Sequence, residues 1–188
     1  MFNIGDKVVY PMHGAGKIVS IEDKAILNEI QSYYIIKMPG EVKVMVPTAK
    51  AEEIGVRPII DKETAGKVVK ILEQESTEMS MNWNKRYRDN MDKLKTGDIY
   101  EVADIVRNLS FKQKDKGLST GEKKMLLNAK QILVSELVLV ESKEREEIEE
   151  FVDNTINTSY ELHGVSSIDE PDTTGTPKIM KKFITTNS

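Results

Sequence analysis

The 188-residue sequence contains no cysteine, only two histidines and only one tryptophan. The absence of cysteine excludes a disulfide framework, a thiolate metal site and a cysteine nucleophile. Because His13 and His163 show no metal-ligand spacing, we expect neither a metal nor a cofactor, and little supports an enzyme. No apolar run approaches the roughly 20 residues that span a bilayer, and the N-terminus lacks the features of a signal peptide. We therefore expect a cytoplasmic protein with no membrane contact.

The charge of the chain is unevenly distributed. Hydrophobic residues make up 39% and charged residues 31% of the sequence, as in a globular protein, and the formal net charge is -4. However, residues 83–131 contain 12 Lys and Arg against 7 Asp and Glu, whereas residues 132–188 contain 5 against 12. A basic block inside an acidic protein predicts one surface that binds a polyanion.

Residues 1–58 have the pattern of a small β domain. Four short runs are rich in β-branched and aromatic residues, and turn residues separate them. Such short antiparallel strands bury enough surface only by curling into a small barrel, which is typically a binding module. One turn, His13-Gly14-Ala15-Gly16, resembles a phosphate loop but has no helix behind it, so we interpret it as a turn. The four runs are Lys7–Tyr10, Lys17–Ile21, Tyr33–Lys37 and Val42–Val46.

From Asp61 the apolar spacing becomes helical. Four successive apolar stripes predict a compact bundle of four or five helices over residues 59–156, so the fold class is α+β with two domains. Helix starts are marked by Asp98 with Glu101 and by Ser119 with Glu122, the spacing of a capping box. Residues 157–188 lose this periodicity, and we predict a flexible acidic tail with a weak apolar pattern at residues 179–184.

The single tryptophan opens a basic run, Trp83-Asn84-Lys85-Arg86-Tyr87-Arg88. A large apolar ring beside cations is suited to DNA, because cations bind phosphates and a ring can press on a base step in the minor groove. The alternative is that Trp83 lies in the core, on one stripe with Tyr87, and that the cations form a solvated helix face. A second basic patch precedes the last long helix: Lys112, Lys114, Lys116, Lys123 and Lys124.

Three motifs resemble the CarD/CdnL family of bacterial transcription regulators. The first motif is Ile4-Gly5-Asp6-Lys7-Val8-Val9-Tyr10-Pro11-Met12-His13-Gly14. The second is Asn82-Trp83-Asn84-Lys85-Arg86-Tyr87-Arg88. The third starts with Gly117-Leu118-Ser119-Thr120-Gly121-Glu122-Lys123-Lys124. They occur in the family's order, and the resemblance extends from about Phe2 to Glu141. It is therefore specific, and it covers about three quarters of the chain.

The resemblance implies that residues 1–58 form a Tudor-like barrel. In the family, this barrel docks on the RNA polymerase β subunit by adding an edge strand to a sheet there. The matching residues are the strand Val42, Lys43, Val44, Met45 and Val46, with Lys24 nearby. Family members carry arginine where this chain has Lys24 and Met45, so the charge is kept at one position and lost at the other.

The resemblance also implies that the helical domain contacts promoter DNA at the upstream edge of the melted bubble. Trp83 matches the family's wedge tryptophan, which enters the minor groove and stabilises the open complex. The matching basic contacts are Lys85, Arg86 and Arg88, with Lys123 and Lys124 from the second patch. No cluster of base-reading residues lies on one helix, so we expect binding that is not sequence-specific, by a monomer associated with the nucleoid through polymerase.

Two alternatives remain at this point. The basic bundle could belong to a free-standing DNA-binding repressor that dimerises through its β domain. The β domain could also be the docking module of a repair translocase, although the chain has no motor motif.

Overall fold

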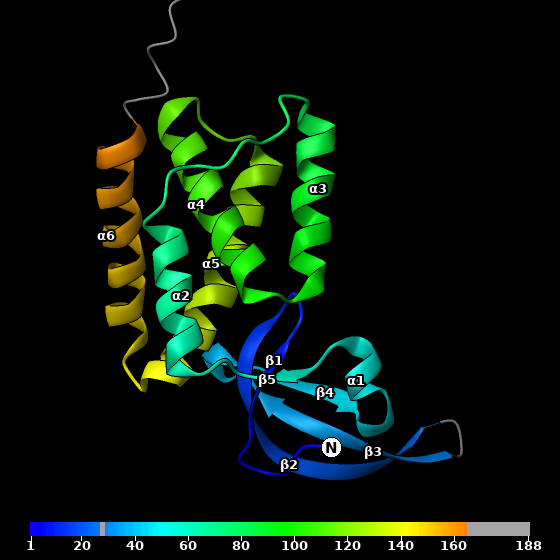
Figure 1. The fold of residues 1–188 in the computed structure, drawn as a ribbon. Helices are drawn as coiled ribbons and strands as arrows, with labels where there is room; N and C mark the ends of the chain where they lie inside the picture. Colours follow the sequence, from blue (N-terminus) through cyan, green and yellow to red (C-terminus); the bar gives the residue numbers. More distant parts are fainter. Residues whose placement is uncertain (27–28, 165–188) are drawn as a thin grey trace, which may run out of the picture.

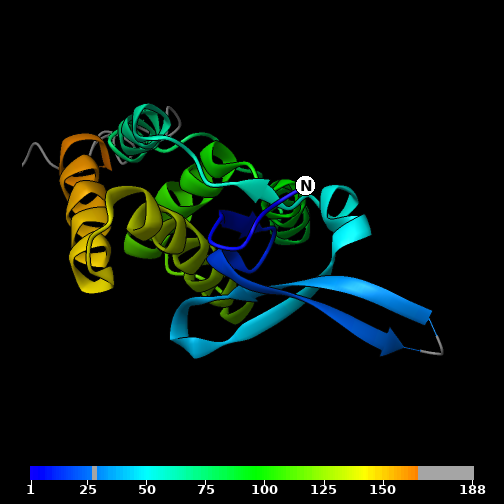
Figure 2. The same ribbon diagram turned by 90° about the horizontal axis from the view of Figure 1, so that it is seen from below.

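The structure is a computed structural model that describes residues 1–26 and 29–164. It has the predicted α+β organisation: an antiparallel sheet comes first in the chain, and a bundle of helices stands on it (Figure 1). Viewed from below, the strands curve beneath the helices, and a long hairpin projects to one side (Figure 2). None of the described helices is long and apolar enough to cross a membrane.

The sheet has five antiparallel strands in the order β4-β3-β2-β1-β5. Its core contains Val8, Ile18, Tyr34, Ile36 and Val46, all almost completely buried. The four predicted strands are confirmed, but the central hairpin is longer than expected, because β2 and β3 stay paired well beyond their apolar residues. The strands are β1 (Lys7–Tyr10), β2 (Gly14–Ile26), β3 (Glu29–Lys37), β4 (Lys43–Pro47) and β5 (Arg57–Pro58), with the short helix α1 (Ala51–Ile54) before β5.

Five helices form the bundle, as the apolar stripes predict. The capping box of Ser119 and Glu122 is present at the start of α5. At α4, Asp98 accepts a hydrogen bond from the Tyr100 backbone N–H, but Glu101 pairs with Lys93 instead of closing the predicted box. The helices are α2 (Lys62–Leu72), α3 (Trp83–Thr96), α4 (Ile99–Asp115), α5 (Thr120–Glu141) and α6 (Arg145–His163).

The prediction that the tail begins at residue 157 is wrong for its first seven residues. Helix α6 continues to His163, and the Ser159 hydroxyl donates a hydrogen bond to the Gln74 carbonyl at the end of α2. The polar surface of this last part hid its periodicity, because only Ile156 and Ser159 are buried there. Residues 165–188, including the weak pattern at 179–184, lie outside the described residues.

A buried carboxylate joins the sheet to the bundle. The Glu136 side chain on α5 is 0% exposed and pairs with Arg57 of β5 through two hydrogen bonds of 2.7 and 3.0 Å. The same carboxylate accepts a hydrogen bond of 2.9 Å from the Ile60 backbone N–H, and Arg57 also donates to the carbonyl of Gly97 at the end of α3. One ion pair therefore ties β5, α3 and α5 together.

The start of β2 packs directly on α5. Gly14 has a φ of +98°, and a Cβ there would lie 2.5 Å from the Ser135 hydroxyl oxygen, so a larger residue would clash. The Ser135 hydroxyl accepts a hydrogen bond of 2.8 Å from the Ala15 backbone N–H. The turn predicted over residues 13–16 instead occupies residues 11–13, because Gly14, Ala15 and Gly16 already pair with β1 as the start of β2. Gly14 serves close packing between the two parts.

We predict that Arg57→Ala destabilises the protein by about 3 kcal/mol, because it leaves a buried carboxylate without its cation. Urea denaturation measures the change in the free energy of unfolding. As a control, Lys143→Ala removes one partner of the exposed Lys143–Glu147 pair and should cost less than about 0.5 kcal/mol. An equal effect of the two substitutions would show that the Arg57 contact carries no special weight.

Candidate nucleic-acid interface

The candidate site lies at the end of the bundle farthest from the sheet (Figure 1). The C-terminal end of α3 is fixed at the sheet, because the Gly97 carbonyl accepts hydrogen bonds from Arg57. Helix α3 has 14 residues. Its first residue, Trp83, therefore lies about 20 Å from that junction, at a rise of about 1.5 Å per residue. Helix α5 begins beside it, since the Trp83 indole contacts Ser119.

Trp83 is held in one orientation yet remains accessible. Its indole N–H donates a hydrogen bond of 2.9 Å to the Ser119 hydroxyl, and its ring stacks on Tyr87 with centroids 5.6 Å apart. The side chain is 44% exposed, and Trp83 is outside the group of residues that forms the bundle core. The alternative that Trp83 is a core residue is therefore not supported. Fixing the ring before binding saves the entropy of ordering it later.

Arg86, in contrast, points into the protein. It is 7% exposed, and its Nε donates a hydrogen bond of 2.7 Å to the Glu122 carboxylate. Its guanidinium also donates to the backbone carbonyls of Ser80 and Met81. Nε and Nη1 of Arg86 are thus both directed at protein groups. We correct the expectation that Arg86 contacts DNA: it fixes the start of α3 to α5.

The inward face of α3 also differs from the predicted stripe. The spacing of Trp83, Tyr87, Met91 and Leu94 predicted an apolar face, but only Leu94 of these is buried. The buried positions are Arg86, Asn90 and Leu94, one helical turn apart in each case. A polar inward face was missed because sequence patterns assign Arg and Asn to the surface.

Glu122 links the two helix starts. Its carboxylate accepts hydrogen bonds from Arg86 and from the Ser119 backbone N–H and hydroxyl. Burial alone would raise the pKa of Glu122, but the hydrogen bonds from Arg86 and Ser119 outweigh burial and hold this pKa below its ordinary value of 4.5. The ionised carboxylate therefore orients Ser119, which in turn binds the Trp83 indole.

Half of the cations in the basic block are neutralised by carboxylates. Arg86, Lys93, Lys95, Arg107, Lys112 and Lys130 each have a carboxylate partner within 4.0 Å. In the described part of the chain, the remaining cations of the block have no ion pair. Four of them lie in the first two turns of α3 and α5, near the positive ends of two helix dipoles. These unpaired cations are Lys85, Arg88, Lys114, Lys116, Lys123 and Lys124.

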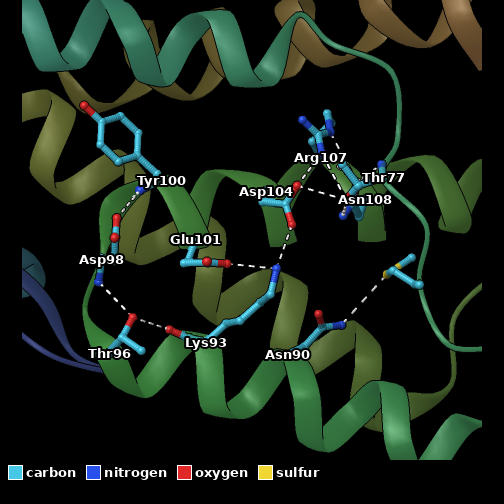
Figure 3. Close-up of polar contacts among 11 residues, drawn as sticks. Thr77, Asn90, Lys93, Thr96, Asp98, Tyr100, Glu101, Asp104, Arg107 and Asn108 are labelled. Carbon is cyan, nitrogen blue, oxygen red and sulfur yellow. Dashed lines mark hydrogen bonds and ion pairs between the residues drawn. The ribbon is translucent and has the colours of Figure 1, made fainter.

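The segment between α2 and α3 is held down by a buried polar network on α4 (Figure 3). The Thr77 backbone N–H donates to Asn108 Oδ1 at 3.0 Å, and the Asn108 amide donates back to the Thr77 hydroxyl at 2.7 Å. Arg107 is 1% exposed and donates to the carbonyl of Ile71 and to Asp104. This network fixes the path of the chain into Trp83.

Lys93 joins this network from α3. Its ammonium pairs with Glu101 at 2.8 Å and Asp104 at 3.0 Å, as the dashed lines of Figure 3 show. Burial would lower the pKa of Lys93, but the two carboxylates raise it above its ordinary value of 10.5. Lys93 is therefore a structural cation and not part of the open basic surface.

The residues expected to bind polymerase lie on the sheet, at the opposite end of the molecule. Strand β4 pairs only with β3 and ends the sheet, so it is an edge strand. Val46 is buried and Val44 partly buried, whereas Lys43 and Met45 face solvent, and Met45 is 53% exposed. Val42 lies just before the strand and is exposed, with its carbonyl accepting from the Met38 N–H. Alternation along the strand is thus as predicted.

Lys24 is not adjacent to β4. It lies on β2 opposite Gln31 of β3, beyond the residues of β3 that pair with β4, and its ammonium pairs with Glu22 at 2.7 Å. The hydrogen bond from Lys24, with a second from Ser20, lowers the pKa of Glu22. Lys24 therefore belongs to the projecting hairpin, separated from the edge strand by β3.

We predict that Glu122→Gln weakens the pH dependence of stability as the pH falls below about 4.5, the ordinary pKa of this carboxyl. Since the folded-state pKa of Glu122 is lowered, its contribution is complete above its ordinary value of 4.5 and is lost as the pH falls through the folded-state pKa. Urea denaturation at a series of pH values measures this. The exposed Glu147→Gln should leave the wild-type profile unchanged, and an unchanged profile for Glu122→Gln would contradict the assigned role.

Comparison with known proteins agrees with this architecture. The model of the CarD-like/TRCF RID domain matches residues 2–60, and the model of the CarD C-terminal domain matches residues 67–153. The Bacillus subtilis (strain 168) protein named "Putative transcription factor YdeB" is 42% identical over 152 residues, covering 80% of this chain and 99% of that protein. The RID domain is Tudor-like and is the polymerase-interacting part of the family. The chain therefore belongs to the CarD-like family of transcription factors.

Proposed function

We propose that this protein binds the RNA polymerase β subunit through the edge of β4 and stabilises the open promoter complex with Trp83. The ring would enter the minor groove at the upstream edge of the melted bubble. One observation carries the proposal: a half-exposed indole is fixed by Ser119 and Tyr87 at a surface where several cations have no carboxylate partner among the described residues. The protein would act without catalysis, in the cytoplasm, at the nucleoid.

A fixed ring can act as a wedge because it binds distorted DNA better than regular duplex. Promoter DNA on polymerase fluctuates between closed and open states, and a ligand shifts this equilibrium only by its difference in affinity for the two. An indole inserted at a base step is favoured where the groove is already widened and the step unstacked. Near balance, a difference of about 1.4 kcal/mol changes the open-to-closed ratio about tenfold.

The unpaired cations support positioning on the phosphate backbone. Four of these cations lie at the same end of the bundle as Trp83. They are Lys85 and Arg88 on α3 and Lys123 and Lys124 on α5. Lysine acts as a point charge toward phosphates and carries no base preference. Binding would therefore be steeply salt-dependent and indifferent to sequence.

An edge strand supports docking by β-augmentation. β4 has one neighbour in the sheet, so one side of its backbone is available to a strand of a partner. The solvent-facing Lys43 and Met45 would then contact the partner's side chains. The junction of Arg57 and Glu136 would keep this anchor and the Trp83 ring at a constant separation.

We predict that Trp83→Ala leaves polymerase binding unchanged and shortens the lifetime of open complexes by about tenfold, the effect of losing about 1.4 kcal/mol. The lifetime is measured on a promoter challenged with a competitor for free polymerase. Met81→Ala is the matched control, because Met81 is an exposed apolar neighbour that precedes the helix. An unchanged lifetime with Trp83→Ala would exclude the wedge.

We predict that Met45→Asp abolishes co-purification with polymerase, because it places a negative charge on the edge strand where family members carry a positive one. Met45→Arg should strengthen docking, since it introduces the positive charge that family members carry at this position. Leu127→Asp, at an exposed position of α5, is the control for added charge.

The mass of the purified protein in solution distinguishes this proposal from a dimeric DNA-binding repressor. Light scattering should give the mass of one chain, because the proposal needs the edge of β4 free. A stable dimer in which Met45→Asp produces monomers would instead favour the repressor.

A further inference from the structure

A groove runs between α2 and α6 on the side of the bundle. Its lower part has a volume of about 440 Å³ and is lined by Ala65, Gly66 and Val69 of α2 and by Ile148 and Phe151 of α6. Its upper part has a volume of about 510 Å³ and continues from Phe151 to Leu162. The two parts share Phe151, so they form one continuous groove along α6.

In the described part of the chain, the lower part of the groove is mainly apolar, and the upper part adds polar side chains such as Thr155 and Thr158. Phe151 is 46% exposed and Leu162 is 69% exposed, both on α6. A Cβ built on Gly66 would meet no atom within 4 Å, so the α2 side of the groove is hollow. Apolar side chains lining one continuous groove mark a surface that binds another chain segment.

We propose that residues 178–184 of this same chain occupy the groove. Their sequence is Lys-Ile-Met-Lys-Lys-Phe-Ile, and in a helix Ile179, Met180, Phe183 and Ile184 would share one face. The lysines at 178, 181 and 182 suit the rim of the groove, where the described glutamates Glu73, Glu141, Glu147 and Glu150 outnumber the lysines Lys62 and Lys143. Apolar and charged features of the segment therefore match those of the groove.

The chain length between the two also suits this contact. Helix α6 ends at His163, beside Leu162 at the upper end of the groove. Residues 165–177 are 13 residues, and the mean end-to-end distance of a chain of this length is about 20 Å. That distance reaches from the end of α6 to Phe151. A tethered segment also has a high effective concentration, which favours it over a second copy of the chain.

The proposed contact concerns a part of the chain beyond the family match, which ends at residue 153. The segment and most residues that line the upper part of the groove lie after that residue. The inference is thus independent of DNA and polymerase binding, and its test uses the free protein.

The absence of cysteine allows a direct test by disulfide trapping in the full-length chain. Gly66→Cys is combined in turn with Ile179→Cys, Met180→Cys, Phe183→Cys or Ile184→Cys, and disulfide formation is followed under a mild oxidant. Gly66→Cys with Thr173→Cys is the control, because residue 173 is nearer along the chain but lacks the apolar pattern. A second control pairs Phe183→Cys with Leu127→Cys, on an exposed position of α5 away from the groove.

We expect a monomeric disulfide in at least one apolar pair that forms about tenfold faster than in either control, the effect of a specific contact over random collision. Phe183→Asp, added to that pair, should remove the advantage. Equal rates in the apolar pairs and the controls would overturn the proposal. Disulfide-linked dimers in place of monomers would also overturn it, and would assign the groove to a second copy of the chain.

Discussion

The Glu136 carboxylate is the constraint on which the arrangement of the two parts depends. A fully buried charge must be compensated, and here Arg57 and the Ile60 N–H compensate it from the chain that leaves the sheet. Because Arg57 also donates to Gly97, the same contact fixes the lower end of α3. Sheet, α3 and α5 therefore form one unit, and the distance between β4 and Trp83 is a property of the fold.

A second buried pair performs a similar task at the opposite end. Arg86 and Glu122 join the first turns of α3 and α5. Ser119 is held by Glu122 and accepts the hydrogen bond of the Trp83 indole, so it fixes the orientation of the ring. The exposed ring is thus supported by a charge pair that water scarcely reaches. A family wedge residue on a fixed support, surrounded by cations without partners, is the arrangement that the proposed open-complex stabilisation requires.

Much of the fold could be predicted from the sequence because it follows from local patterns. Short β-branched runs with turn residues gave the strands of the sheet, and the change to helical spacing at Asp61 gave the bundle. The Ser119 and Glu122 spacing gave a capping box that the structure contains. The end of α6 was missed, because its exposed polar residues from 157 to 163 resemble a linker and its contact with Gln74 is distant in sequence.

The sequence by itself determined the family, the α+β class, the position of Trp83 and the presence of a basic block, because these depend on motifs, periodicity and composition. Only the tertiary structure decided which cations of that block are open. Arg86, Arg107 and Lys93 look like open surface charges in a linear pattern, yet carboxylates from other turns or helices pair with them. The physical reason is that an ion pair depends on the positions of both charges in space. A sequence pattern describes only residues that are close together along the chain.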